Sequence, residues 1–213
     1  MRKRLSSNLI TRHLQEHSSI YLFLMVLFLM GIIFGAIMVN SLSDHQKEDL
    51  FYYLNQFFGQ VEEGAMVSSQ DLLKLSFLHN LKFAGLIWIL GVSIIGLPLI
   101  FVLLFIKGIV VGFSVGFFVN QMGWQGLLLA FGSLLPQNLF IIPAFIFVAA
   151  CSVSLSIKLI RKIFIRQTFS FQLVPVFSRY VLAYIATILV ITIAASIEAY
   201  LTPALMKAII AGF

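Results

Sequence analysis

The sequence predicts an all-α integral membrane protein, a polytopic helical bundle with about five transmembrane helices and one amphipathic helix in an outer loop. Of its 213 residues, 61% are hydrophobic and only 10% are charged, and the mean hydropathy is +1.04. A soluble domain carries about 25% charged residues. The composition therefore excludes an ordinary soluble globule and, more firmly, a disordered chain. We expect residues 1–213 to form a single membrane domain.

The first predicted span covers residues 20–39, which contain no charge. A basic N-terminal segment precedes it, so a secretory signal peptide is the alternative. A signal peptide has an apolar region of about 7–15 residues, followed by small residues at the cleavage site. This run is longer, and the sequence Asn-Ser-Leu-Ser-Asp follows it at residues 40–44. We therefore expect an uncleaved membrane anchor.

Four more spans follow from the need for about 20 apolar residues to cross about 30 Å of hydrocarbon. Residues 83–106 form the second span, and Lys107 then marks a segment on the inner face. The third and fourth spans divide either at residues 120–125, which leaves a long fourth helix, or at residues 136–138, which leaves a fourth helix at residues 139–157. Both divisions give the same topology. The last span covers residues 180–200.

The charges orient these spans. With residues 1–19 in the cytoplasm, the inner segments, which include the basic loop at residues 158–179, hold ten of the 14 Lys and Arg residues. The outer loop at residues 41–81 holds six of the eight acids. Cytoplasmic loops of membrane proteins are enriched in Lys and Arg. The sequence therefore predicts a cytoplasmic N-terminus and an extracytoplasmic C-terminus.

The outer loop contains a predicted amphipathic helix at residues 46–61. Its apolar stripe consists of Leu50, Leu54, Phe57, Phe58 and Val61, which recur at helical spacing. One interpretation is a helix that lies on the outer leaflet or caps the bundle. The other is a docking face for an extracytoplasmic partner, because helix-in-groove recognition uses anchors at this spacing. A loop of this size is too small to be a catalytic domain.

Glycines repeat every fourth residue in two predicted spans, at Gly31 and Gly35 in the first and at Gly108, Gly112 and Gly116 in the third. Small residues at this spacing let helix backbones approach closely. The contact can lie within one bundle or between protomers, so the pattern favours internal packing and leaves a homo-oligomer open.

Three polar positions in the apolar spans are candidate functional residues. Gln137 and Asn138 follow Pro136 in the fourth segment, where they either line a broken helix on a substrate path or form a turn or packed kink. Glu198 is the one acid within an apolar span. Intramembrane carboxylates are costly and indicate function. The alternative is a hydrogen-bonded carboxylate near the outer end of the last helix, within reach of water.

The remaining polar residues form no recognisable catalytic or metal site. His13 and His17 are four residues apart without a third ligand nearby, and Cys151 is the single cysteine. We find no phosphate-binding loop and no nucleophile elbow, so we expect no enzyme, no cofactor and no metal. Residues 158–179 mix cations with aromatic and aliphatic side chains. At a membrane surface this composition favours anionic lipid headgroups over nucleic acid.

Several strings of residues carry a resemblance to a known family. They are Asn-Ser-Leu at residues 40–42, the unusual loop string at residues 47–60, Ile-Ile-Gly-Leu-Pro at 94–98, Phe-Val-Asn-Gln-Met-Gly at 118–123, Pro-Gln-Asn-Leu-Phe at 136–140 and Glu-Ala-Tyr-Leu at 198–201. On these residues the chain resembles the stage II sporulation protein M family, over essentially its whole length.

The resemblance implies a non-enzymatic membrane scaffold in forespore engulfment, at the sporulation septum and the engulfing membrane. Its implied partners are stage II sporulation proteins D and P, two membrane-anchored hydrolases that thin septal peptidoglycan. Members of the wider family often carry Pro-His-Gly and a Glu three residues later, where this chain has Gln137 and Ile141. That departure favours a scaffold over the alternative, a transporter or channel subunit that uses the broken fourth helix and Glu198.

Overall fold

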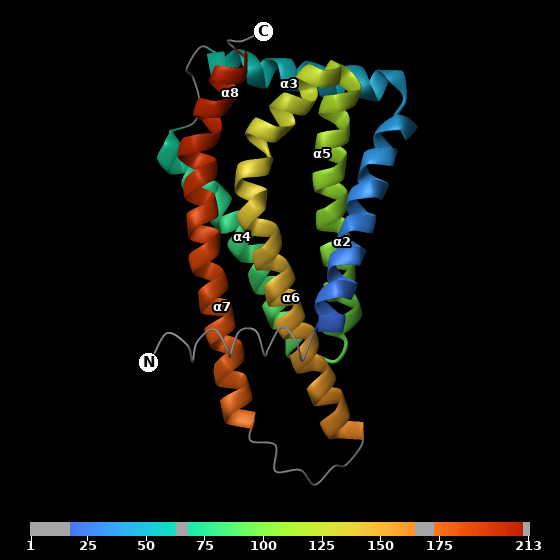
Figure 1. Ribbon diagram of the computed structural model, residues 1–213, viewed down its shortest axis with the longest axis vertical. Helices are drawn as coiled ribbons and strands as arrows, with labels where there is room; N and C mark the ends of the chain where they lie inside the picture. The colour runs from blue at the N-terminus through green and yellow to red at the C-terminus, as the bar shows by residue number, and fades with distance from the viewer. Residues whose placement is uncertain (1–17, 63–67, 165–172, 211–213) are drawn as a thin grey trace.

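The computed structural model describes residues 18–62, 68–164 and 173–210, and nearly all of them are helical. Five helical segments in this part of the chain are long and apolar enough to cross a membrane, namely Ser18–Ser41, Ser69–Gly91, Gly96–Ser133, Leu135–Arg161 and Phe177–Ile209. Figure 1 shows them side by side in one bundle. The prediction of an all-α membrane bundle is confirmed.

Helix α3 (Asp44–Glu62) follows α2 (Ser18–Met38) and lies across one end of the bundle, which we call the α3 end (Figure 1). Helix α4 (Ser69–Gly91) then runs to the opposite end, and α5 (Gly96–Ser133) returns. Helix α6 (Leu135–Phe164) leads away from the α3 end again. Helix α7 (Leu173–Ser196), the π-helical segment η2 (Ile197–Leu201) and α8 (Thr202–Ile210) together lead back to it.

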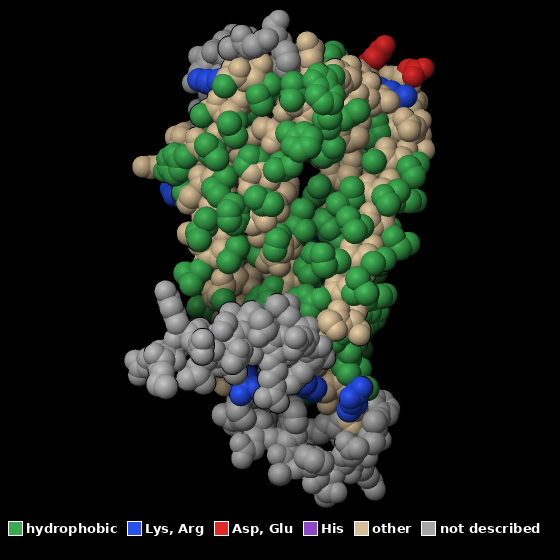
Figure 2. Space-filling model, viewed as in Figure 1, with side chains coloured by type: hydrophobic (Ala, Val, Ile, Leu, Met, Phe, Trp, Pro, Cys, Tyr) green, Lys and Arg blue, Asp and Glu red, His purple; other side chains and the backbone are tan. Residues whose placement is uncertain are grey.

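Helix α6 is the central helix of the bundle. In its most apolar stretch 72% of the residues are buried, against 22–28% in the other four spans. Its buried face is rich in small side chains, including Ala149, Ala150, Ser152, Ser154 and Ser156. Small residues allow neighbouring helices to approach closely in a membrane. The outer helices instead expose large apolar side chains, as Figure 2 shows, which suits contact with lipid.

The glycines of α2 and α5 pack against each other. A Cβ on Gly31 would lie 2.5 Å from the Phe105 carbonyl oxygen, and one on Gly108 would lie 2.5 Å from the Phe28 carbonyl oxygen. Gly112 and Gly116 face the next residues along α2 in the same way. Because residue numbers rise together on both helices, α2 and α5 are parallel. The structure thus uses these glycines inside one chain.

The second span differs from the prediction of residues 83–106. Helix α4 begins 14 residues earlier, because Ser68 Oγ accepts a hydrogen bond from the Asp71 backbone N–H at 3.2 Å and donates one to the Asp71 carboxylate at 2.7 Å. Ser68 is thus the N-cap of α4, a position where serine is strongly preferred. Helix α4 ends at Gly91, and α5 starts at Gly96, where a Cβ would lie 1.9 Å from the Leu90 carbonyl oxygen. The tight turn between the two helices therefore requires glycine. The polar loop expected at residues 41–81 accordingly ends near residue 68.

A second correction concerns Lys107, which we expected on the inner face. Because α5 starts at Gly96, Lys107 lies well inside this helix. The division between the third and fourth spans is also resolved. Gly123 has a φ of +57° within α5, and the chain reverses there at the α3 end (Figure 1). This is the turn at residues 120–125, while Pro136 begins the first turn of α6, where proline is tolerated.

Candidate functional site: a polar pocket inside the bundle

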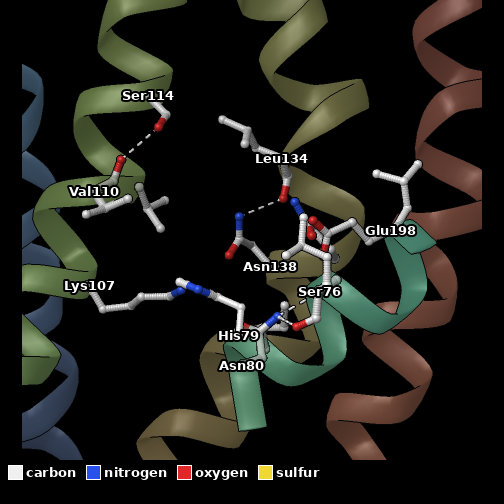
Figure 3. A pocket seen from close by; sticks show the side chains of 14 residues that line it. Ser76, His79, Asn80, Lys107, Val110, Ser114, Leu134, Asn138 and Glu198 are labelled. Atoms are coloured by element: carbon white, nitrogen blue, oxygen red, sulfur yellow. Dashed lines mark hydrogen bonds between the residues drawn. The ribbon is translucent and has the colours of Figure 1, made fainter. Parts of the chain in front are cut away.

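A pocket of about 400 Å³ lies between α4, α5, α6 and η2 (Figure 3). Its apolar lining consists of leucine, valine and isoleucine side chains. The polar lining, unusual at this depth in an apolar bundle, is Ser76, His79, Asn80, Lys107, Ser114, Gln137, Asn138 and Glu198. Polar and ionisable residues within membrane spans are costly and usually mark function. The pocket is therefore the candidate functional site.

Glu198 is positioned by an irregular part of the last helix. In η2 the Thr202 backbone N–H donates to the Ile197 carbonyl, five residues back. The irregularity precedes Pro203, which has no amide hydrogen to donate to the chain before it. Such π segments occur frequently at functional sites. Because the helix continues to Ile210, Glu198 lies about 18 Å from its end at 1.5 Å per residue, well inside the bundle. Glu198 therefore lies farther from the end of the helix than the sequence interpretation of a helix-end carboxylate had it.

The Glu198 carboxylate accepts hydrogen bonds from two other helices. Ser76 Oγ on α4 donates to Glu198 Oε2. The Gln137 side chain on α6 donates to Glu198 Oε1 at 2.9 Å, in the amide orientation that satisfies both groups. Asn80 supports Ser76 in turn, since its Nδ2 donates to the Ser76 carbonyl at 3.0 Å. Charge-assisted hydrogen bonds of this kind hold a carboxylate in place.

Lys107 supplies the opposite charge from α5. Its Nζ lies 5.4 Å from the ring centroid of Phe83 and 5.3 Å from that of Phe145. These are cation–π distances. Within residues 18–62, 68–164 and 173–210, no ion pair joins Lys107 to Glu198, and no hydrogen bond is made by the Lys107 ammonium group. The pocket thus presents an ammonium group and a carboxylate that do not neutralise each other by direct contact.

Asn138, unlike Gln137, is held by its own helix. Its Nδ2 donates to the Leu134 carbonyl at 2.8 Å, and its backbone N–H donates to the same oxygen at 3.2 Å (Figure 3). Leu134 joins α5 to α6, and its carbonyl oxygen accepts both bonds. Asn138 therefore stabilises this junction and leaves its side-chain oxygen toward the pocket. The structure brings together all three polar residues singled out in the sequence, because Gln137, Asn138 and Glu198 all line the pocket.

An apolar groove of about 450 Å³ adjoins this pocket between α5 and α6. It is lined by Val115, Phe131, Leu139, Ile142 and Pro143, among others. Figure 2 shows a hollow in the surface between these two helices. The groove and the polar pocket share Val111, Leu134 and Asn138 in their linings. An apolar surface groove therefore adjoins a charged interior pocket at these three residues.

The predicted outer stripe on α3 is described only in part. Leu50 and Leu54 are half-buried, whereas the side chains of Phe57, Phe58 and Val61 lie outside the described part of the structure. Tyr52 and Tyr53, on the remaining circumference, are 67% and 68% exposed. Half-burial of two stripe residues fits a helix that caps the bundle. The exposed aromatic face is formed by the two tyrosines instead.

Other sequence predictions fall partly outside the described residues. His13 and His17 lie there entirely, as does much of the basic segment at residues 158–179. In the described chain, no group of three His, Cys, Asp or Glu residues is placed to hold a metal ion.

Sequence reasoning missed Lys107, Ser76, His79, Asn80 and Ser114 as members of the pocket. The sequence did contain signals that could have placed these residues. Gly91, Ser93, Gly96 and Pro98 are turn formers inside the presumed second span. With the turn placed there, Lys107 becomes intramembrane, and α4 brings its polar face into the bundle.

Comparison with known proteins agrees with this architecture. The sequence model of the stage II sporulation protein M family matches residues 24–203, which include the pocket and α3. No curated protein and no solved structure matches the chain. The family match extends over most of the sequence and covers three complete spans and most of the first and the last. This multi-pass membrane protein therefore belongs to the stage II sporulation protein M family.

Proposed function

We propose that this protein is a non-enzymatic scaffold in the sporulating cell membrane. It would hold two extracytoplasmic cell-wall hydrolases, stage II sporulation proteins D and P, at the septum during forespore engulfment. Family membership supports a role in sporulation. In this proposal the α3 end faces the cell wall and presents the contact surface, and residues 1–19 lie in the cytoplasm.

The distribution of charge supports this orientation. The α3 end carries Asp44, Glu48, Asp49 and Asp71, whereas Lys158, Arg161 and Arg179 lie toward the opposite end, where α6 ends and α7 begins. Figure 2 shows acidic side chains together with some basic ones at the α3 end, and further basic side chains at the other end. Excess Lys and Arg mark cytoplasmic segments. The C-terminus would then be extracytoplasmic.

The exposed face of α3 is the observation that carries the proposal. Tyr52 and Tyr53 stand side by side as an edge-to-face pair, with ring centroids 5.9 Å apart and an interplanar angle of 70°. Tyrosine is enriched among residues that dominate the energy of protein interfaces. Asp49 and Glu48 flank this pair on the exposed surface. A partly exposed aromatic pair with a polar rim suits a protein partner better than lipid.

The pocket residues fit a structural role for the hydroxyl group of Ser76. Ser76 Oγ donates a hydrogen bond to the Glu198 carboxylate. Among the described residues, no hydrogen bond joins Ser76 to His79. In this proposal the bond is structural, because it supplies the Glu198 carboxylate with a donor inside the bundle.

The test is co-purification of the two hydrolases from sporulating cells after crosslinking. A Tyr52→Ser/Tyr53→Ser variant is expected to recover both hydrolases at no more than about one tenth of the wild-type level, since loss of two interface anchors costs about 2 kcal/mol or more. Tyr52→Phe/Tyr53→Phe, which keeps both rings, is the matched control. The Leu54→Ser/Phe57→Ser/Phe58→Ser variant tests the other face of α3. Unchanged recovery with both serine variants, at normal membrane levels, would refute an α3 interface.

A transporter or channel subunit is the second candidate, and the polar pocket favours it. A charged cavity enclosed by discontinuous helices is typical of solute sites in transporters. This candidate predicts that Glu198→Gln abolishes engulfment while hydrolase recovery stays at the wild-type level. A fully functional Glu198→Gln strain would exclude ion-coupled transport through this carboxylate.

A further inference from the structure

The polar pocket and the apolar groove adjoin each other, so a charged cavity lies beside an apolar one. Their linings share Val111, Leu134 and Asn138. The groove opens on the surface that faces outward from the bundle between α5 and α6 (Figure 2). In a membrane protein this surface meets acyl chains. The occupant that such a site can take directly from its surroundings is a lipid.

The charges of the pocket select the headgroup. Lys107 offers an ammonium group that has no hydrogen-bond or ion-pair partner in the described chain. An unpaired cation in an apolar bundle is costly, and a phosphate would supply the missing counter-charge. Glu198 offers a carboxylate that accepts from Ser76 and Gln137 and has further acceptor capacity. A ligand cation that donates hydrogen bonds would fill the remaining acceptor positions of this carboxylate.

From this arrangement we infer that the site binds one zwitterionic phospholipid with a phosphoethanolamine headgroup. The phosphate lies near Lys107, the ammonium group lies near Glu198, and an acyl chain fills the groove between α5 and α6. Asn138 and Ser114 line the same pocket and supply neutral hydrogen-bonding groups. This inference is independent of the proposed scaffold, because it concerns a different surface and needs no hydrolase.

Lipid selectivity is the first test, and it uses the intact wild-type protein. Purified protein in detergent is titrated with phosphatidylethanolamine or phosphatidylglycerol with the same acyl chains, and bound lipid is counted by native mass spectrometry. We expect phosphatidylethanolamine to bind at least about tenfold more tightly, because the glycerol headgroup lacks the ammonium group that pairs with the buried carboxylate. Equal affinity for the two lipids, or preference for phosphatidylglycerol, would overturn the inference.

Variants then locate the lipid. Lys107→Gln and Val115→Trp, which remove the phosphate partner and fill the groove, should each weaken phosphatidylethanolamine binding about tenfold or more. Glu198→Gln should reduce the preference over phosphatidylglycerol. The matched controls are Lys82→Gln on α4 and Val102→Trp on α5, which lie outside both linings and should bind like wild type. Unchanged binding in folded Lys107→Gln and Val115→Trp would refute the site.

A competition experiment distinguishes a bound lipid from a bound free solute. Soluble glycerophosphoethanolamine carries the same headgroup without chains and should compete at least about tenfold more weakly than the lipid, since it buries no chain in the groove. Equal competition would show a site for a free solute and overturn the lipid assignment. If Lys107→Gln or Val115→Trp does not fold, wild-type selectivity and its loss in Glu198→Gln decide the question.

Discussion

Ser76 on α4 donates a hydrogen bond to the carboxylate of Glu198, which follows it by 122 residues. The bond joins the second span to the last and closes one side of the polar pocket. It also explains how an acidic side chain is accommodated in an apolar bundle, since the carboxylate receives donors from two helices. Removal of either partner leaves a polar group without its bond in a place where water is scarce.

We expect Ser76→Ala to destabilise the folded protein by about 1–3 kcal/mol, because it leaves the carboxylate short of a donor. Glu198→Gln should have a smaller effect, since it removes the charge that needs solvation. In the double variant the two effects should not add, and the coupling should be about 0.5–3 kcal/mol. The free energy of unfolding in mixed micelles measures all three. Additive effects would show that this bond does not contribute to stability.

The contact between α2 and α5 predicts a strong response at Gly112. A Cβ there would lie 2.0 Å from the Ile32 carbonyl oxygen. Gly112→Val should therefore force the helices apart and cost about 2 kcal/mol or more of stability. Gly59→Ala on α3 is the control, because a Cβ at Gly59 meets nothing within 4 Å, and alanine favours a helix by about 0.5–1 kcal/mol. Thermal unfolding should separate the two variants in opposite directions. Similar midpoints would contradict the packing.

A second buried cluster fixes the end of the bundle opposite α3. Tyr180 Oη donates to the Trp88 carbonyl at 2.5 Å and hydrogen-bonds Ser152 Oγ at 2.9 Å. Tyr180→Phe should cost about 1–3 kcal/mol, because it leaves these groups without a partner. Tyr184→Phe is the matched control, since Tyr184 stacks on Trp88 with centroids 5.0 Å apart and keeps its ring. Equal unfolding free energies for the two variants would argue against this network.

The turn between α4 and α5 gives a direct test of topology. Cys151 is the single cysteine, so a Cys151→Ser background permits labelling at chosen sites. Ile94→Cys should react with an impermeant maleimide only from the cytoplasmic side, and Gln125→Cys only from the outside. Lys107→Cys should react more slowly than these two cysteines from either side, because residue 107 lies well inside α5. Rapid labelling of Lys107→Cys from the cytoplasm would restore the turn that the sequence alone suggested.

The sequence predicts the bundle well because five apolar runs leave few other solutions for a backbone in lipid. It also predicts Glu198, Gln137 and Asn138 as unusual polar residues. The boundaries of the spans were harder to predict, because a hydropathy pattern places a turn at a charged residue. Lys107 therefore led to a predicted turn beyond the one that precedes Gly96 in the structure. The turn at Gly91–Gly96 depends on close backbone contact instead, as the Cβ distance at Gly96 shows.

The pocket itself could not be predicted, because it depends on which helices are neighbours. Ser76 and Asn80 read as part of a solvated loop until α4 is seen to start at Ser69 and to face η2. Lys107 reaches the same cavity only because α5 lies beside α4 and α6. Periodicity within one segment carries no information about such long-range contacts. The exposed pair Tyr52 and Tyr53 was not predicted either, because the sequence pattern indicated the apolar stripe of α3, on the opposite face, as the contact surface.

The parallel contact of α2 with α5 has a consequence for biosynthesis. Gly31 and Gly108 are 77 residues apart, and at about 5–20 residues per second the ribosome needs roughly 4–15 s to make the chain between them. During that interval α2 resides in the bilayer without its glycine-faced neighbour. Helix α2 is stable in the bilayer on its own because a helix satisfies its own backbone hydrogen bonds in lipid. The contact between α2 and α5 therefore forms by a delayed, lateral docking of the first helix.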